Sequence, residues 1–164
     1  MPTINLRAYQ PADNDAVLRL NEQSVHYLAP MDMPRLQQLL AWSAELRIAE
    51  YDGEVAGFLV TFEDGSDYDS VNYQWFSEHL KRFVYIDRIV IDQSFRGKGI
   101  GQYIYQQLRH DAASDASALW LAAEIDIEPR NDYSLNFHQK QGFVEVASQQ
   151  AGQGKQVSLQ VLAV

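Results

Sequence analysis

The sequence feature that most constrains the fold of this chain is a glycine-rich turn between an apolar run and a segment whose apolar residues have helical spacing. Residues 83–91 form the apolar run, which is typical of a buried strand. The turn Arg96–Gly101 follows, and apolar or small side chains then recur at helical spacing at Ile100, Ile104, Leu108 and Ala112. Glycine lets a backbone approach a ligand closely, and the free N–H groups of a helix's first turn attract anions. The segment therefore predicts a pyrophosphate site or, alternatively, a plain strand-to-helix turn with a solvated tip.

Two common nucleotide-binding motifs do not fit this spacing. A P-loop needs G-x-x-x-x-G-K-[ST], but Lys98 is followed by Gly99 and not by a hydroxyl residue. A dinucleotide fingerprint needs G-x-G-x-x-G. Gly99 and Gly101 match its first two positions, whereas Ile104 occupies the third. A generic nucleotide-binding module is therefore not supported.

The spacing of Arg96, Gly99 and Gly101 fits R-x-x-G-x-G, which resembles the acyl-CoA pyrophosphate loop of the GNAT N-acetyltransferases. A second stretch similar to that family follows the strand-like run 119–127 and comprises Asn131, Ser134, Phe137, His138, Lys140, Gly142 and Phe143. The family usually has Tyr where this chain has His138. The pair Phe137-His138 and the run 85–91 also resemble a little-characterised branch of the superfamily, which suggests no substrate.

The resemblance implies an α/β fold: a single GNAT-like domain over residues 1–164, with a mixed, mostly antiparallel sheet of six or seven strands flanked by about four helices. Patterns along the chain agree with such an order. Asp52-Gly53 between two apolar runs is a strong hairpin signal, and Pro34 suits the first turn of a helix. Strands are expected at residues 4–8, 46–51, 55–62, 83–91, 119–127, 143–147 and 157–161.

The resemblance also implies how an acyl-CoA would bind, with acetyl-CoA as the default donor. A locally bulged strand would bind the pantetheine and polarise the thioester carbonyl with its N–H groups. The glycine loop would hold the pyrophosphate, where its two cations add charge-assisted hydrogen bonds. The residues expected to bind the cofactor are Ile89, Val90, Ile91, Arg96, Gly97, Lys98, Gly99, Ile100, Gly101, Asn131, Ser134 and Phe137.

Direct acyl transfer to an amine requires a base and benefits from an acid. An ammonium has no lone pair, so a carboxylate or a histidine must first remove a proton, directly or through water. Asp87, Glu124 and Asp126 lie on or near the two strands that would flank the cofactor, although each could equally be an ion-pair or capping residue. The resemblance places a proton donor for the departing thiolate at His138. The alternative is that His138 only packs against its helix.

Residues 63–82 form a long insert between two predicted strands, acidic at first and then aromatic. Its carboxylates and rings are Glu63, Asp64, Asp67, Asp69, Tyr68, Tyr73, Trp75 and Phe76. Such a segment could bind an ammonium group by ion pairing and cation–π contact. It could equally be a helix that packs Trp75, Phe76 and Leu80 onto the sheet behind a solvated acidic loop.

Composition narrows the class of protein further. With 164 residues, of which 46% are hydrophobic, the chain can bury a core, and no run approaches the ~18 apolar residues of a membrane span. The first residues lack a signal-peptide pattern, so we expect a cytoplasmic protein. The absence of cysteine excludes disulfides, thiolate metal sites and an acyl-cysteine intermediate, and the histidines show no metal-binding arrangement, so we expect no metal. A net charge of −9 argues against nucleic acid and suits either a cationic acceptor or simple solubility.

These patterns together predict an acyl-CoA-dependent N-acetyltransferase with direct transfer to an amine. The expected partner is a small-molecule amine acceptor, cationic or amino-acid-like, with no nucleic acid and no membrane; a homodimer is allowed. The expected catalytic residues are His138, Glu124 and Asp87. The alternative is a non-catalytic CoA-binding sensor or regulatory protein that kept the loop and lost the acid.

Overall fold

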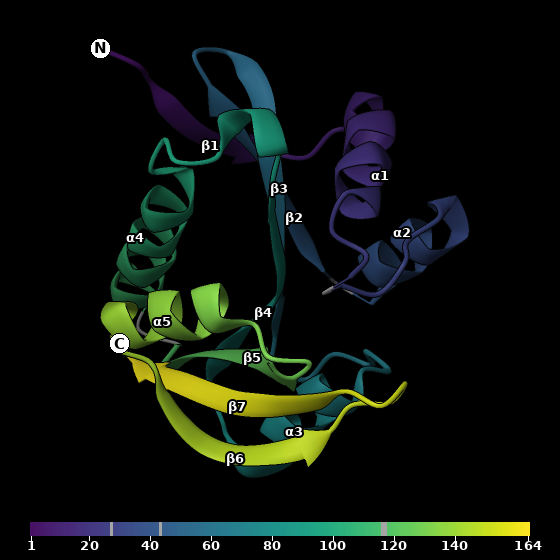
Figure 1. The fold of residues 1–164 in the computed structure, drawn as a ribbon, viewed down its shortest axis with the longest axis vertical. Coiled ribbons are helices and arrows are strands. Elements are labelled where there is room, and N and C mark those ends of the chain that lie inside the picture. The colour runs from purple at the N-terminus through teal and green to yellow at the C-terminus, as the bar shows by residue number, and fades with distance from the viewer. Residues whose placement is uncertain (27, 43, 116–117) are drawn as a thin grey trace. The chain divides into compact units, whose positions relative to one another are not determined.

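The computed structural model describes residues 1–26, 28–42, 44–115 and 118–164. Strands and helices alternate along the chain in the order β1 (Ile4–Ala8), α1 (Asn14–Glu22), α2 (Met33–Ala41), β2 (Glu45–Tyr51), β3 (Glu54–Glu63), α3 (Val71–His79), β4 (Phe83–Ile91), α4 (Ile100–Ser114), β5 (Trp120–Glu128), α5 (Asp132–Gln141), β6 (Val144–Gln150) and β7 (Gln156–Ala163) (Figure 1). Two short 3-10 helices, Pro11–Asp13 and Gln93–Phe95, precede α1 and follow β4.

The seven strands form a mixed sheet in the order β1-β2-β3-β4-β5-β7-β6. β4 and β5 are parallel, whereas the pairs β1/β2, β2/β3, β5/β7 and β6/β7 are antiparallel. The predicted α/β class, with a mixed and mostly antiparallel sheet, is therefore confirmed. The structure has one α-helix more than the four expected: α3, which lies within the insert 63–82. The chain divides into two compact units, Met1–Phe62 with Arg88–Leu108, and Glu63–Asp87 with Arg109–Val164.

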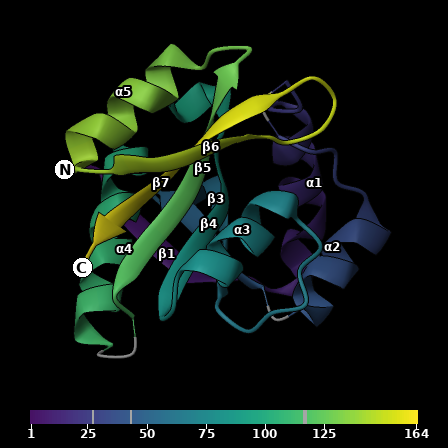
Figure 2. The same cartoon turned by 90° about the horizontal axis from the view of Figure 1, so that it is seen from below.

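The first unit contains strands β1, β2 and β3. Helices α1 and α2 lie on one side of β2 and β3, and the start of α4 lies on the other (Figures 1 and 2). At the predicted β2–β3 hairpin, Asp52 and Gly53 have φ of 50° and 81°, the left-handed conformation that such tight turns require. The core of this unit is formed by fully buried apolar side chains, among them Val17, Leu20, Leu36, Leu39, Ile48 and Phe58.

Strand β3 approaches the end of β4 closely at Gly57. A Cβ atom on Gly57 would lie 2.3 Å from the carbonyl oxygen of Val90, so no larger residue fits without moving the backbone. One residue earlier, the carbonyl of Ala56 accepts the N–H of Asp92 at 2.8 Å. These contacts fix the point at which β4 ends and the glycine loop begins.

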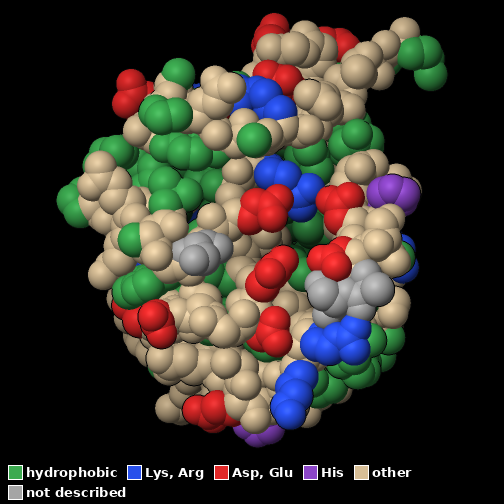
Figure 3. Space-filling model, turned by 180° about the vertical axis from the view of Figure 1, so that it is seen from behind, with side chains coloured by type: hydrophobic (Ala, Val, Ile, Leu, Met, Phe, Trp, Pro, Cys, Tyr) green, Lys and Arg blue, Asp and Glu red, His purple; other side chains and the backbone are tan. Residues whose placement is uncertain are grey.

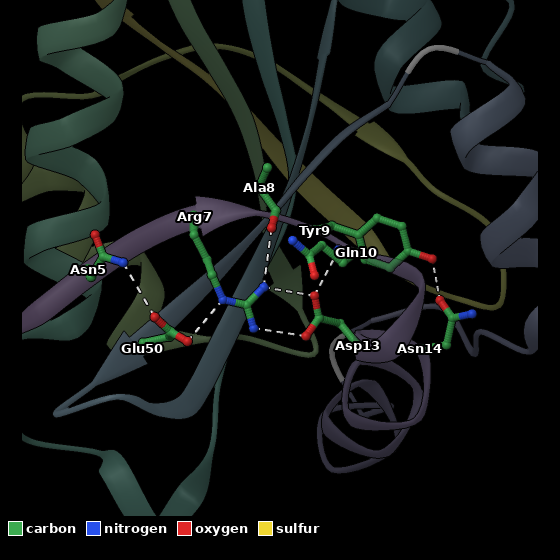
Figure 4. Close-up of polar contacts among 8 residues, drawn as sticks. All are labelled: Asn5, Arg7, Ala8, Tyr9, Gln10, Asp13, Asn14 and Glu50. Carbon is green, nitrogen blue, oxygen red and sulfur yellow. Dashed lines mark hydrogen bonds and ion pairs between the residues drawn. The ribbon is translucent and has the colours of Figure 1, made fainter.

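An ion network holds β1 to β2 and to the start of α1 (Figure 4). The guanidinium of Arg7 donates two hydrogen bonds to Asp13 and one to Glu50, each at 2.9 Å. Asp13 also accepts the N–H of Gln10 at 2.8 Å, which fixes the short helix before α1. Because Arg7 favours the charged carboxylates, the pKa values of Asp13 and Glu50 are lowered. We call Arg7, Asp13 and Glu50 the Arg7 network.

The second unit contains β5, β7 and β6, with α3 and α5 on opposite faces of β5 and β7 (Figures 1 and 2). Helix α3 begins at Ser70, whose side chain accepts the N–H of Tyr73 at 3.2 Å. Beneath α3 the rings of Tyr68, Tyr73, Phe76, Phe83 and Tyr85 pack against one another at centroid distances of 5.4–6.4 Å. The insert therefore contributes to an aromatic core as well as to the surface.

Among the described residues, no helix is both long enough and apolar enough to cross a membrane. Acidic side chains recur over the face drawn in Figure 3, interspersed with basic and apolar ones, as the net charge of −9 leads one to expect.

Candidate active site

The glycine loop of the first unit is built by local backbone geometry. Asp92 accepts the N–H of Ser94 at 3.0 Å and starts the short helix that follows β4. Gly97 and Gly99 then adopt φ of 77° and 79°, a left-handed conformation that residues with a side chain rarely tolerate. Ile100 is buried and anchors the first turn of α4, whereas residues 96–99 are exposed. The loop is thus an exposed tip fixed at both ends.

The first turn of α4 has the features of an anion site. Its leading N–H groups have no partner within the helix, since helical bonding begins with the N–H of Tyr103 and the carbonyl of Gly99 at 3.0 Å. The ammonium of Lys98 lies 5.4 Å from the ring centroid of Tyr51. An added Cβ on Gly97 or Gly99 would meet nothing within 4 Å, so backbone conformation and not crowding requires glycine there. The expected strand residues Ile89 and Ile91 are half-buried, and Val90 is buried.

A group of polar side chains surrounds Glu124 in the second unit. The hydroxyl of Tyr85 donates to the Glu124 carboxylate at 2.7 Å, and the side chain of Asn72 also favours the charged form of that carboxylate. Nearby, the hydroxyl of Tyr68 donates to Asp87 at 2.5 Å. Strands β4 and β5 and the insert each supply members of this group, which we call the Glu124 cluster: Tyr68, Asn72, Tyr85, Asp87 and Glu124.

The environment of Glu124 favours its protonated form. Burial, followed by the negative charge of Asp87, raises the pKa of Glu124 to about 8, while the hydrogen bond from Tyr85 and the polar side chain of Asn72 lower this pKa. Burial and the neighbouring carboxylates raise the pKa of Tyr85 well above its usual value, so its hydroxyl stays protonated and donates. A carboxyl that titrates near pH 8 can both accept and return a proton at physiological pH.

The other carboxylate on this strand face, Asp126, has a different environment. It is buried and ion-paired with Lys155 at 3.3 Å. Burial raises the pKa of Asp126, and the charge of Lys155 opposes that effect. The ion-pair role that the sequence left open for Asp126 is therefore the one observed.

His138 is buried on helix α5. Its Nδ1 lies 2.7 Å from the carbonyl oxygen of Ser134, so this nitrogen carries a hydrogen and donates. The ring meets Phe143 edge-on at a centroid distance of 5.1 Å. Burial lowers the pKa of His138, and the imidazole is therefore mainly neutral at pH 7. Asn131 caps the same helix by accepting the N–H of Ser134 at 3.2 Å, and Phe137 is half-buried beside His138.

Glu124 and His138 lie on opposite faces of the sheet in the second unit. Helix α5 covers the face of Leu121 and its register partner Leu162, because Leu162 lies against Gly142 at the end of that helix. Glu124 projects from the alternate face, together with its register partner Leu159. The two candidate groups therefore cannot exchange a proton directly.

The insert contains the helix expected as one alternative from the sequence, and this helix buries Phe76 as expected but Tyr73 in place of Trp75 and Leu80. Tyr73 and Phe76 are buried, and the Tyr73 hydroxyl donates to the carbonyl of Glu63 at 2.6 Å. Trp75 is half-buried and stacks on His79 at a centroid distance of 4.0 Å. Leu80, expected to pack, is half-buried just beyond the helix. The ring of Tyr73 is therefore committed to the core.

Sequence reasoning missed three members of the Glu124 cluster. Tyr85 shares a strand face with Asp87 at i and i+2, a signal that could have found it. Tyr68 and Asn72 lie in the insert, where no periodicity indicates a side chain directed at a distant strand. Across residues 1–26, 28–42, 44–115 and 118–164, no group of three or more His, Asp or Glu side chains is arranged to hold a metal ion.

Comparison with solved structures identifies proteins that share this architecture. Among solved structures, a protein assigned as a phosphinothricin N-acetyltransferase is 22% identical, with a TM-score of 0.73 and 99% of each chain covered. Ard1 from Thermoplasma volcanium is 18% identical, with a TM-score of 0.76 over 98% of this chain and 97% of that one. A Salmonella typhimurium protein solved with its cofactor acetyl-CoA is 18% identical, with a TM-score of 0.69 over 98% and 94%.

These structural likenesses show the fold. No curated protein matches the sequence. The acetyltransferase (GNAT) family matches residues 14–143, which include the glycine loop, the Glu124 cluster and helix α5. The chain belongs to the GNAT acetyltransferase family.

Proposed function

We propose that this protein is an acyl-CoA-dependent N-acetyltransferase that transfers an acetyl group directly to a small cationic or amino-acid-like amine, with Glu124 as the general base. The observation that carries the proposal is the environment of Glu124: burial and Asp87 raise its pKa to about 8, and Tyr85 donates to it at 2.7 Å. A base is most effective when its pKa lies near the working pH. The family match supports the acetyl-transfer class of reaction.

The proposed reaction moves one proton before and one after the acyl transfer. A free amine is mainly an ammonium at neutral pH, so the Glu124 carboxylate accepts its proton, directly or through water. The amine lone pair attacks the thioester carbonyl carbon and gives a tetrahedral intermediate. As the C–S bond breaks, the nitrogen loses its second proton, which leaves a neutral amide on the acceptor, and the CoA thiolate takes up one proton, directly or through water. Because the chain has no cysteine, no acyl-cysteine intermediate can form.

The glycine loop is the proposed site for the CoA pyrophosphate. The left-handed backbone at Gly97 and Gly99 and the free N–H groups of α4 support this role, with Arg96 and Lys98 as cations. The residues Ile89, Val90 and Ile91 are proposed to bind the pantetheine through their backbone, and Asn131, Ser134 and Phe137 to line the cofactor. The Salmonella typhimurium relative solved with acetyl-CoA supports the choice of donor.

A non-catalytic CoA-binding sensor is the second candidate, and one observation favours it. The family usually has Tyr at the position of His138, and here the imidazole is mainly neutral at pH 7 and donates its Nδ1–H to Ser134. A protein without an effective proton donor for the thiolate could bind CoA and turn over slowly or not at all. Enzyme and sensor differ in a single measurable property, the release of free CoA.

The decisive assay mixes the protein with acetyl-CoA and a panel of amines and measures the free CoA thiol. The protein itself contributes no thiol background, because it has no cysteine. We expect thiol release with at least one cationic amine and its loss in Glu124→Gln. Binding of acetyl-CoA without thiol release for any amine would support the sensor.

Cofactor binding is tested separately by thermal unfolding. A ligand at 100 times its Kd stabilises a fold by about 2.7 kcal/mol, and Gly99→Val should abolish this stabilisation by acetyl-CoA. The matched control is Gly152→Val, because Gly152 has a similar φ of 81° in the β6–β7 turn and open space around it. Both variants strain the backbone, but only Gly99→Val should lose the stabilisation by acetyl-CoA. An unchanged melting temperature of the wild type at millimolar acetyl-CoA would end the proposal.

A further inference from the structure

The ring of Tyr51, at the end of strand β2, contacts the glycine loop. The ammonium of Lys98 lies 5.4 Å from the centroid of this ring, within the distance at which a cation is attracted to an aromatic face. Tyr51 is half-buried, whereas Lys98 is exposed. The contact joins two segments of the first unit that lie far apart in the sequence, the β2–β3 hairpin and the loop between β4 and α4.

The ring of Tyr51 is held firmly by its surroundings. In the sheet, Tyr51 pairs with Ile4 of β1 on one side and with Glu54 of β3 on the other. Its ring packs against the ring of Phe95, in the short helix that precedes the glycine loop, at a centroid distance of 5.8 Å. Two neighbouring strands and a second ring therefore fix the surface on which Lys98 rests.

Lys98 by contrast has a flexible side chain on the exposed tip of the loop. It lies between Gly97 and Gly99, whose left-handed backbone conformation shapes the turn. Among the described residues, no carboxylate forms an ion pair with Lys98, so its positive charge is not neutralised by the protein. Binding a phosphate requires this long side chain to be ordered, which costs free energy. A contact that restricts Lys98 before the ligand arrives reduces that cost.

We propose that Tyr51 is a positioning residue for the cofactor: its ring orders the ammonium of Lys98 to bind one of the phosphate groups of acyl-CoA. This inference rests on the proposed function, which places the CoA pyrophosphate at the glycine loop. A carboxylate in place of the ring would also order the ammonium, but it would neutralise the positive charge and repel the phosphate. An aromatic ring adds no charge and leaves the N–H donors of Lys98 available to phosphate oxygens.

The test is a double-mutant cycle on the dissociation constant of CoA, measured by calorimetry in about 0.15 M salt, where distant exposed charges are screened. Tyr51→Leu should weaken CoA binding about two- to fivefold, which corresponds to an exposed cation–π contact of about 0.5–1 kcal/mol. Lys98→Met should weaken binding more, because a charge is lost, and in that background Tyr51→Leu should have no further effect. Tyr51→Phe keeps the ring and should bind CoA as the wild type does. Lys81→Met removes an exposed charge of the second unit and is the control, with an unchanged dissociation constant.

Dephospho-CoA, which lacks the 3′-phosphate, identifies the phosphate group that Lys98 binds. An effect of Tyr51→Leu that persists with dephospho-CoA assigns Lys98 to the pyrophosphate, and an effect that disappears assigns it to the 3′-phosphate. Additive losses in the double variant, or a Tyr51→Phe variant that binds as weakly as Tyr51→Leu, would overturn the inference. Tighter binding in Tyr51→Leu would also overturn it, since the ring would then hold the ammonium away from the phosphate.

The outcome for the wild type separates this inference from the proposed function. A wild type that does not bind CoA contradicts both, whereas a wild type that binds CoA without coupling between Tyr51 and Lys98 contradicts only the positioning role. If Tyr51→Leu does not fold, the proton NMR signal of the Lys98 ε-methylene group in the wild type is the second readout. The ring current of Tyr51 should displace this signal from that of the exposed Lys81, and coincident signals would overturn the inference.

Discussion

The Arg7 network and the Glu124 cluster each bring two carboxylates together, yet the carboxylates respond in opposite ways. Arg7 lies between Asp13 and Glu50 and donates to both, which lowers the pKa of each (Figure 4). Around Glu124 the neutral side chains of Tyr85, which donates a hydrogen bond, and Asn72 favour the charged form, while Asp87 adds a like charge. There the pKa of Glu124 rises to about 8.

The difference shows what separates a structural carboxylate from a chemically useful one. A guanidinium fixes the charged form, so Asp13 and Glu50 stay ionised at every physiological pH and serve only to hold β1, β2 and α1. Neutral donors orient Glu124 without compensating for burial, so both of its protonation states remain accessible. Substitutions at five positions, taken from the largest expected effect to the smallest, test this contrast.

The largest effect is expected from Glu124→Gln. Gln keeps the shape of the side chain and still accepts from Tyr85, but it cannot take a proton. Turnover at pH 8 should fall by about 10²- to 10⁴-fold, the range for loss of a general base, while acetyl-CoA binding is retained. Thiol release with the single best acceptor of the panel provides the measurement. A variant within twofold of wild type would remove Glu124 from the mechanism.

His138→Phe tests whether a buried, mainly neutral imidazole contributes a proton. If His138 protonates the thiolate, turnover should fall by about 10²-fold with cofactor binding intact, and His138→Tyr should recover part of the rate. If the ring only packs between Ser134 and Phe143, His138→Phe keeps full activity and the thiolate takes its proton from solvent. Kinetics at saturating acetyl-CoA, together with a melting scan, distinguish these outcomes.

Asp13→Asn should lower stability without changing the chemistry. Loss of the charged bonds to Arg7 is expected to cost about 1.5–3 kcal/mol of unfolding free energy at pH 7. Because the pKa of Asp13 is lowered in the folded state, this stabilisation is present above pH 3.8 and is lost as pH falls further. Urea unfolding of wild type and variant at pH 7 and pH 3 measures the difference, with the exposed Asp15→Asn as control. An equal loss at both pH values would contradict the ionic origin.

The smallest effects are expected from a pair of substitutions that move the pKa of Glu124 in opposite directions. Asp87→Asn removes a negative charge and should lower this pKa, so activity extends to lower pH. Tyr85→Phe removes a donor to the carboxylate and should raise it, so activity retreats to higher pH. At a pH below the pKa of Glu124 in both wild type and variant, moving this pKa by one pH unit changes the fraction of Glu124 in the base form about tenfold. Displacement of both pH–rate profiles in the same direction would show that another group sets the titration.

Local backbone signals were readable in the sequence, whereas contacts between distant segments were not. The β2–β3 turn at Asp52-Gly53 and the start of α4 after the glycine loop follow from residue types that fix φ over a few positions. Glu124 is a candidate from the sequence because it lies on a predicted strand that, by the family resemblance, flanks the cofactor. Its partners Asn72 and Tyr68 could not be predicted, since they lie more than fifty residues earlier in an insert whose helix start is set by Ser70. The effect of such partners on a pKa depends on burial, which no sequence period encodes.

The most direct test of a base at Glu124 is the pH dependence of kcat/KM for the acceptor at saturating acetyl-CoA, in wild type and in Glu124→Gln. We predict that kcat/KM of the wild type rises tenfold per pH unit from pH 6 and bends near pH 8, where the raised pKa of Glu124 lies. In Glu124→Gln this bend should disappear and only the titration of the acceptor amine should remain. A bend at pH 8 that persists in Glu124→Gln, or a wild-type profile that is flat across pH 6–9, would contradict the assignment.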